Sequence, residues 1–186
     1  MKEFSFNLYS LFRKNGFTFK RDVITFFCTL SPFLCMTMAC DYKFLAEKQI
    51  QLDKRYLRMA KIWAENSYCI RRQVGALIVK DKMIISDGFN GTPSGFENIC
   101  EDEDGKTKPY VLHAEANAIT KVAKSANDSD GATLYVTTSP CIECAKLIIQ
   151  SGIKKVVYCE PYRIDDGIQL LKRANIEVVQ LDINEQ

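Results

Sequence analysis

Residues 132–159, ATLYVTTSPCIECAKLIIQSGIKKVVYC, decide the fold class of this chain. ATLYVTT (132–138) and KKVVYC (154–159) are rich in β-branched and aromatic residues, and each predicts a strand. Between them, CIECAKLIIQSG (141–152) predicts a helix that ends at Gly152. A strand, a helix and a second strand in succession are typical of an α/β protein.

The sequence on either side continues this alternation. VGALIVK (74–80) and MIISDGFNG (83–91) are joined by Asp81 and Lys82, so they predict a hairpin, and 92–110 predicts a long surface loop. The remaining predicted elements are helices at 52–67, 114–124 and 166–174 and a final strand at 176–181. This order predicts a three-layer α/β/α fold, with helices on both faces of a central mixed sheet of about five strands.

The composition fits a globular protein without a strong electrostatic preference. Of the 186 residues, 47% are hydrophobic and 26% are charged, which excludes disordered, fibrous and acidic-tail classes. The formal net charge is only +2, so no global field attracts the chain to nucleic acid or to an anionic membrane. Eight cysteines are too few for a disulfide scaffold, and the C-x-x-C pair among them favours a reducing, cytoplasmic setting.

The N-terminal part differs from the rest of the chain. Residues 23–40, VITFFCTLSPFLCMTMAC, carry no charge and follow basic residues, which is the layout of an export signal or a minimal membrane span. An upstream extension, with the native start at Met36 or Met38, explains the same pattern, and a domain element is a third interpretation. We predict that 1–50 is an atypical apolar extension outside the main domain, 51–182. A membrane contact is expected only if the N-terminal segment is genuine.

Two short motifs carry the chemistry. His113, the only histidine, begins His113-Ala114-Glu115, and 27 residues separate it from Cys141 in Pro140-Cys141-Ile142-Glu143-Cys144. One imidazole and two thiolates suit Zn²⁺, and three protein ligands leave the fourth tetrahedral position open, as catalytic zinc requires. Zinc lowers the pKa of a bound water to roughly 7, and Glu115 beside the open position is suited to shuttle protons between that water and a substrate.

Two other interpretations of the cysteine pair are weaker. A closed structural zinc site needs a fourth ligand from Cys69, Cys100, Cys159 or an acid, and none of these has paired spacing. A thioredoxin-like redox site does not explain the histidine motif. The combination of His-x-Glu with Pro-Cys-x-x-Cys is the signature of zinc deaminases, which favours catalytic zinc.

On these motifs the chain resembles the cytidine and deoxycytidylate deaminase superfamily, over about residues 52–181. The resemblance also rests on Gln73-Val74-Gly75-Ala76, on GFNGTPSG (88–95) and on Asn117-Ala118-Ile119, and the last two are similar to the dCMP branch. It implies a cytidine-deaminase-like fold with a zinc cofactor. It also implies hydrolytic deamination of dCMP to dUMP and ammonia, which supplies dUMP for thymidylate synthesis.

A nucleotide substrate needs groups that hold its sugar and phosphate. The resemblance implies that Asn90 contacts the sugar, that Gly91 belongs to a loop holding the nucleotide, and that Tyr162 lies near the pocket. From the residues alone, Arg71 or Arg72 is the nearest phosphate ligand, since a guanidinium fork matches phosphate oxygens. The alternatives are a solvated loop for the arginines, a left-handed turn for Asn90 and a core position for Tyr162.

Other functions stay open on the same fold. They are deamination of another base, nucleoside or tRNA adenosine, and a non-catalytic nucleic-acid-associated or DNA-uptake role. The near-neutral charge argues against tRNA, and a binding module has no need of Glu115. We therefore expect a cytoplasmic homo-oligomer whose partner is a small-molecule nucleotide and not a nucleic acid.

Overall fold

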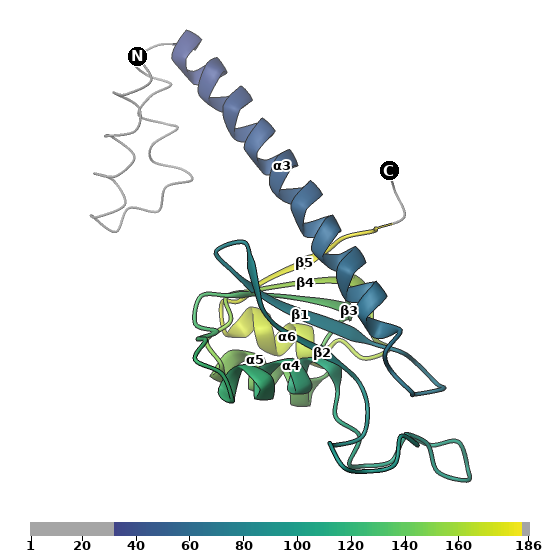
Figure 1. Cartoon of the computed structure of the whole chain (residues 1–186). Helices are drawn as coiled ribbons and strands as arrows, with labels where there is room; N and C mark the ends of the chain where they lie inside the picture. Colours follow the sequence, from purple (N-terminus) through teal and green to yellow (C-terminus); the bar gives the residue numbers. More distant parts are fainter. Residues whose placement is uncertain (1–31, 184–186) are drawn as a thin grey trace. The chain divides into compact units, whose positions relative to one another are not determined.

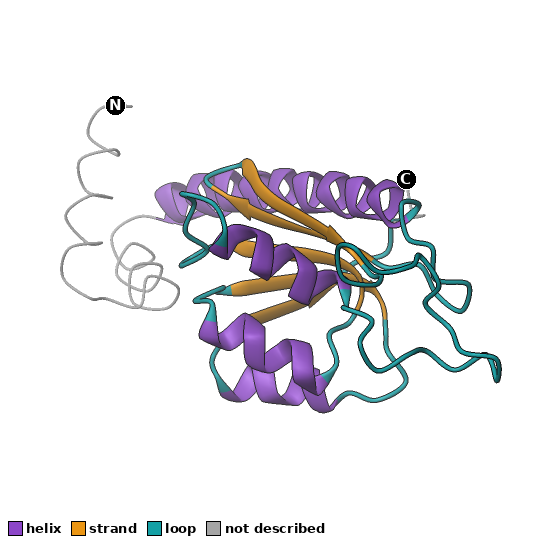
Figure 2. Cartoon of the chain, turned by 60° about the horizontal axis from the view of Figure 1, so that its bottom comes forward, coloured by secondary structure: helices purple, strands orange, loops and turns teal. Residues whose placement is uncertain are grey.

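The chain adopts the predicted α/β architecture (Figures 1 and 2). The computed structural model describes residues 32–183. Its elements are α3 (Pro32–Ala64), β1 (Gly75–Lys80), β2 (Met83–Phe89), α4 (Ala114–Ala123), β3 (Thr133–Thr138), α5 (Ile142–Gln150), β4 (Lys155–Glu160), α6 (Asp166–Arg173) and β5 (Glu177–Gln180). Apart from α3, the bounds agree with the predicted ones to within two residues.

The strands form one mixed sheet, as predicted. Its order is β2-β1-β3-β4-β5, with β1 antiparallel to both neighbours and β3, β4 and β5 parallel to one another. As a result, the carboxyl ends of β2, β3 and β4 and the amino end of β1 meet at one edge. In open α/β sheets, ligands bind outside the carboxyl ends of the strands. This edge therefore carries the candidate site.

Helices cover both faces of the sheet and complete the three layers. α4, α5 and α6 lie on one face, where Ile78 and Val136 enter a common core with them (Figure 1). Strand residues alternate between faces, so Leu77 and Val79 enter a second core together with Leu57 of α3. Both cores consist mainly of aliphatic side chains excluded from water, which is the main source of stability in such a fold.

Helix α3 begins far upstream of the predicted position. The pattern predicts a helix over 52–67, whereas α3 spans Pro32–Ala64. Proline is favoured at the first position of a helix, and neither glycine nor proline follows it before Ala64. The predicted start of this helix at residue 52 was therefore wrong.

Half of residues 23–40 lie before Pro32, outside the described part of the chain, so the interpretation of this segment stays a prediction. Within 32–183, none of the helices combines the length and the hydrophobicity that a membrane span requires. The chain divides between Ile50 and Gln51 into two units, and the second contains the whole sheet and α4–α6. The assignment of 1–50 to an extension outside the catalytic domain also stays a prediction.

A buried carboxylate connects α3 to the sheet. Asp53 is 2% exposed, Tyr135 donates its hydroxyl to Asp53 Oδ1 at 2.6 Å, and Lys155 donates to Oδ2 at 2.9 Å. Burial, together with the bond to Asp53, raises the pKa of Tyr135, so its hydroxyl stays protonated and donates. Each of these buried polar groups is thereby satisfied.

Replacing Asp53 with Ala is expected to lower the free energy of unfolding by about 3 kcal/mol, because Lys155 and Tyr135 lose their shared carboxylate. Urea denaturation followed by circular dichroism measures the change. The control is Asp104→Ala, which removes an exposed ion pair with Lys106 and should leave the midpoint unchanged. Equal midpoints for both variants would contradict the assigned role of Asp53.

Candidate active site

The two zinc motifs meet at the functional edge of the sheet. His113 is the N-cap residue of α4, Cys141 is the N-cap residue of α5, and Cys144 lies in the first turn of α5. His113 Nδ1 lies 3.4 Å from Cys141 Sγ and 3.3 Å from Cys144 Sγ, and one ligand atom from each residue lies within 4.8 Å of the others. The fold thus brings together residues that are separated in sequence.

The geometry of this cluster fits zinc. Zn–S bonds of about 2.3 Å and Zn–N bonds of about 2.0 Å place tetrahedral nitrogen and sulfur ligands roughly 3.5 Å apart, close to the observed separations. His113 is exposed, whereas Cys144 is buried, so the cluster is accessible from one side only. Among the described residues, Cys69, Cys100 and Cys159 do not belong to the cluster, so it does not form the closed structural site.

The three candidate ligands shift one another's pKa values. A hydrogen bond from Cys144 is the main reason that the pKa of Cys141 is lowered to about 3. The same bond, together with burial, raises the pKa of Cys144. The hydrogen bond to Cys141 raises the pKa of His113. The pKa of Cys141 is thus lowered and that of Cys144 raised, and because a coordinating thiol is deprotonated outright, a bound cation would displace the proton that Cys144 retains.

Glu115 is buried beside these ligands. It occupies the second position of α4 and is 4% exposed. Burial raises the pKa of its carboxyl group above the ordinary value, while its own backbone N–H and the neighbouring His113 act in the opposite direction. A carboxyl group with a raised pKa beside a set of metal ligands can accept and release protons near neutral pH.

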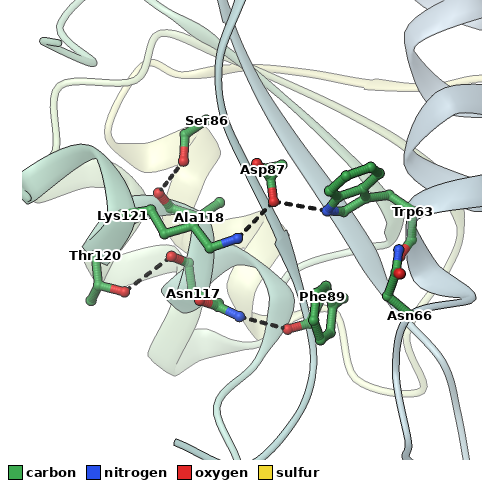
Figure 3. Close-up of polar contacts among 9 residues, drawn as sticks. All are labelled: Trp63, Asn66, Ser86, Asp87, Phe89, Asn117, Ala118, Thr120 and Lys121. Carbon is green, nitrogen blue, oxygen red and sulfur yellow. Dashed lines mark hydrogen bonds and ion pairs between the residues drawn. The ribbon is translucent and has the colours of Figure 1, made fainter. Parts of the chain in front are cut away.

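The start of α4 is held against the end of β2. Asn117 donates its side-chain amide to the Phe89 carbonyl at 3.0 Å (Figure 3). Gly88 allows the close approach of the two elements, because a Cβ at this position would collide with the carbonyl of Ala114. These contacts fix the turn of helix that carries the histidine motif.

Further along, α4 is attached to the same strand by side chains (Figure 3). Ser86 donates its hydroxyl to the Ala118 carbonyl at 2.7 Å. Asp87 Oδ1 accepts from Lys121 of α4 at 2.6 Å and from the Trp63 indole of α3 at 2.8 Å. The edge strand β2 is thereby connected to both helical layers.

The loop that leads into α5 is packed against the connection between β4 and α6. Ser139 donates its backbone N–H to the Glu160 carbonyl at 2.8 Å, and the Ser139 hydroxyl accepts from the Tyr162 N–H at 2.7 Å. A Cβ at Gly167 would collide with the carbonyl of Pro140, so glycine allows α6 to approach this loop closely. The loop that leads to Cys141 is therefore held by contacts with the end of β4, with the segment that follows β4 and with α6.

A cavity of about 560 Å³ opens at this edge, a size suited to a small-molecule ligand. Of the sequence-predicted residues, the cavity lining includes His113, Glu115, Cys141, Arg71, Arg72, Asn90 and Tyr162. Polar or charged lining residues that the sequence did not indicate include Glu101, Lys106, Thr107, Ser139 and Arg163. Zinc-ligating and candidate phosphate-binding groups thus share one cavity.

Asn90 and Gly91 follow β2 and connect it to the segment before β1 and to the segment before α4. Asn90 Oδ1 accepts from the Val74 N–H at 2.7 Å, and Nδ2 donates to the Arg72 carbonyl at 2.8 Å. Asn90 is not among the residues with positive φ, so the left-handed turn proposed as an alternative is wrong. Gly91 is not part of the cavity lining and pairs with Leu112 through backbone bonds of 3.1 and 2.8 Å. A sugar contact by Asn90 stays a prediction.

The two adjacent arginines have different partners. Arg72 Nη2 forms an ion pair with Glu160 Oε2 at 3.0 Å. Arg71 Nη1 donates to the neutral Thr107 hydroxyl at 3.3 Å, and no carboxylate among the described residues forms an ion pair with it. The Arg71 guanidinium therefore keeps an unmatched positive charge at the cavity.

Tyr162 lies in the cavity wall and not in a core. The guanidinium of Arg163 lies over its ring, 5.6 Å from the centroid. Arg163 could have been found from the sequence, since it follows Tyr162 directly after a predicted strand. Lys106 and Thr107 carry no such signal, because they belong to a loop whose path depends on tertiary contacts.

Comparison with known proteins places this site in a family. Residues 50–160 match the cytidine and deoxycytidylate deaminase zinc-binding region, and the chain belongs to that family. Its cofactor is zinc, in agreement with the donor set of the cluster. This confirms the resemblance and the cofactor predicted from the two motifs.

Several relatives are similar over most of the described chain. The solved dCMP deaminase of cyanophage S-TIM5, in complex with dCMP and dUMP, is 48% identical, with a TM-score of 0.69, and the match covers 70% of this chain and 97% of that one. Deoxycytidylate deaminase of Saccharomyces cerevisiae is 35% identical over 72% of this chain, but the match spans only 46% of the yeast protein. ComE operon protein 2 of Bacillus subtilis is 38% identical, over 74% of this chain and 75% of the relative.

Proposed function

We propose that this protein is a zinc-dependent dCMP deaminase that converts dCMP and water to dUMP and ammonia. The observation that carries the proposal is a single cavity with His113, Cys141 and the buried Glu115 at one end and the unmatched Arg71 guanidinium in its wall. The deoxycytidylate deaminases among its relatives support the same substrate.

In this proposal His113, Cys141 and Cys144 hold the zinc ion, which, when bound, supplies a water that ionises near neutral pH. Glu115 accepts the proton of that water and delivers protons to the pyrimidine ring nitrogen and to the leaving amine. Its burial keeps bulk water from competing for the proton. A purely binding protein would gain nothing from such a carboxyl group.

The remaining cavity residues hold the nucleotide. Arg71 binds the phosphate, whereas the ion pair with Glu160 makes Arg72 the weaker phosphate ligand. Asn90 and Tyr162 line the cavity and are the candidates for contacts with the sugar and the base, whereas Gly91 lies outside the lining and acts only through its backbone pairing with Leu112. A cytoplasmic location belongs to the same proposal, since the site depends on reduced thiols, and the predicted homo-oligomeric state stays a prediction.

The substrate assignment predicts that kcat/KM for dCMP exceeds that for deoxycytidine about thirtyfold or more, since the nucleoside leaves the guanidinium unpaired. Arg71→Ala should remove most of this preference by lowering kcat/KM for dCMP alone. A spectrophotometric assay with both substrates measures the effect. Arg173→Ala, at an exposed position of α6 outside the cavity, is the matched control. Equal kcat/KM for nucleotide and nucleoside in the wild type would refute the dCMP assignment.

A further inference from the structure

The loop between β2 and α4 contains a buried carboxylate that has no role in proton transfer. Glu101 is 9% exposed, whereas the acidic residues 102–104 that follow it are exposed. Its Oε1 atom accepts the backbone N–H of Ile70 at 3.1 Å and that of Arg71 at 3.2 Å. The carboxylate thus joins two segments that lie 30 residues apart in sequence.

Glu101 is held in place by a closed turn, which we call the acidic hairpin (residues 100–108). Lys108 donates its backbone N–H to the Cys100 carbonyl at 2.8 Å, and Asp102 donates to the Lys106 carbonyl at 2.8 Å. Gly105 closes the turn with a φ of 71°, a conformation that glycine adopts without strain. The hairpin is therefore a defined structure that can hold a side chain in one place.

The acidic hairpin attaches to Arg71 at two points. Glu101 accepts the backbone N–H of Arg71, and the Thr107 hydroxyl accepts from its guanidinium at 3.3 Å. All three residues line the cavity that contains Glu115. Because the charge of Glu101 is directed at backbone N–H groups, the positive charge of the guanidinium stays available to a ligand.

We propose that Glu101 is a positioning residue that fixes Arg71 for the substrate phosphate, so that the acidic hairpin sets the preference for a nucleotide over a nucleoside. The inference rests on the proposed dCMP deaminase function. Glu101 acts through Arg71 and does not touch the reacting atoms. Its loss should therefore weaken binding of the phosphorylated substrate and leave the chemical step unchanged.

The test is steady-state kinetics of Glu101→Ala, Glu101→Gln and Glu103→Ala with dCMP and with deoxycytidine. In Glu101→Ala we expect KM for dCMP to rise about tenfold while kcat stays within about twofold, and kcat/KM for deoxycytidine to stay unchanged. Glu101→Gln keeps the Oε1 acceptor and should restore most of the affinity. Glu103 is exposed, so Glu103→Ala should behave like the wild type.

A second variant guards against misfolding of the first. Thr107→Val removes the contact to the guanidinium while leaving the backbone attachment intact, and it should raise KM for dCMP by a smaller factor. Equal losses with both substrates in Glu101→Ala, or an unchanged KM for dCMP in Glu101→Ala, would overturn the inference. A wild-type protein that does not deaminate dCMP would instead overturn the proposed function, and the inference with it.

Discussion

Glu115→Gln is expected to lower kcat for dCMP about a thousandfold or more, while the protein keeps its fold and its zinc. Glutamine has nearly the same volume and fills the same buried position, so packing around α4 is preserved. It cannot accept the proton of the attacking water or return a proton to the ring nitrogen and the amine. The raised pKa that burial gives Glu115, which suits it to this exchange near neutral pH, has no counterpart in an amide.

Three measurements check this expectation: kcat with saturating dCMP, the zinc content and the denaturation midpoint. Glu143→Gln is the matched control, because Glu143 lies in the first turn of the neighbouring helix α5, is exposed and pairs only with Lys146 in the described structure. That variant should retain wild-type turnover. If Glu115→Gln kept more than about a tenth of the wild-type kcat, another group would have to transfer the protons.

The parts of the fold and site that the sequence predicts are those encoded by local patterns. The strand bounds from Gly75 onward follow from runs of β-branched residues, and the end of α5 follows from Gly152. The zinc cluster is predictable because its three ligands sit in two short motifs, each at the start of a helix. Cys144 follows Cys141 by three residues, so one turn of α5 places both sulfurs on the same side.

What the sequence could not predict depends on contacts between distant segments. Arg71 and Arg72 are equivalent as adjacent residues, and they differ because Arg72 pairs with Glu160, 88 residues later, whereas Arg71 contacts Thr107. Glu101 stands in an acidic run, and nothing in the sequence distinguishes the one carboxylate that becomes buried. The early start of α3 was missed because residues 32–40 are uncharged, so that part of the helix has no polar face to give a periodic signal.

Cys144→Ala is expected to remove the zinc ion and, with it, measurable deamination. The wild-type chain should contain about one zinc ion, and the variant less than about a tenth of that, since zinc sites of this kind need three protein ligands. Cys144 is the most buried of the three, at 2% exposure, so water cannot easily replace its sulfur. Inductively coupled plasma mass spectrometry on dialysed protein gives the zinc content. Retention of a full zinc ion by the variant would contradict the ligand assignment.

Cys159→Ala provides the control for loss of a thiol. Cys159 lies outside the cluster, and burial raises its pKa to about 11, so its sulfur stays protonated and binds no metal at neutral pH. This variant should keep both zinc and turnover. Together with Glu115→Gln, which should lose turnover and keep zinc, the two cysteine variants separate metal binding from proton transfer. A site in which Glu115 instead ligated the metal would lose zinc in Glu115→Gln as well, and the measured zinc content distinguishes these two arrangements.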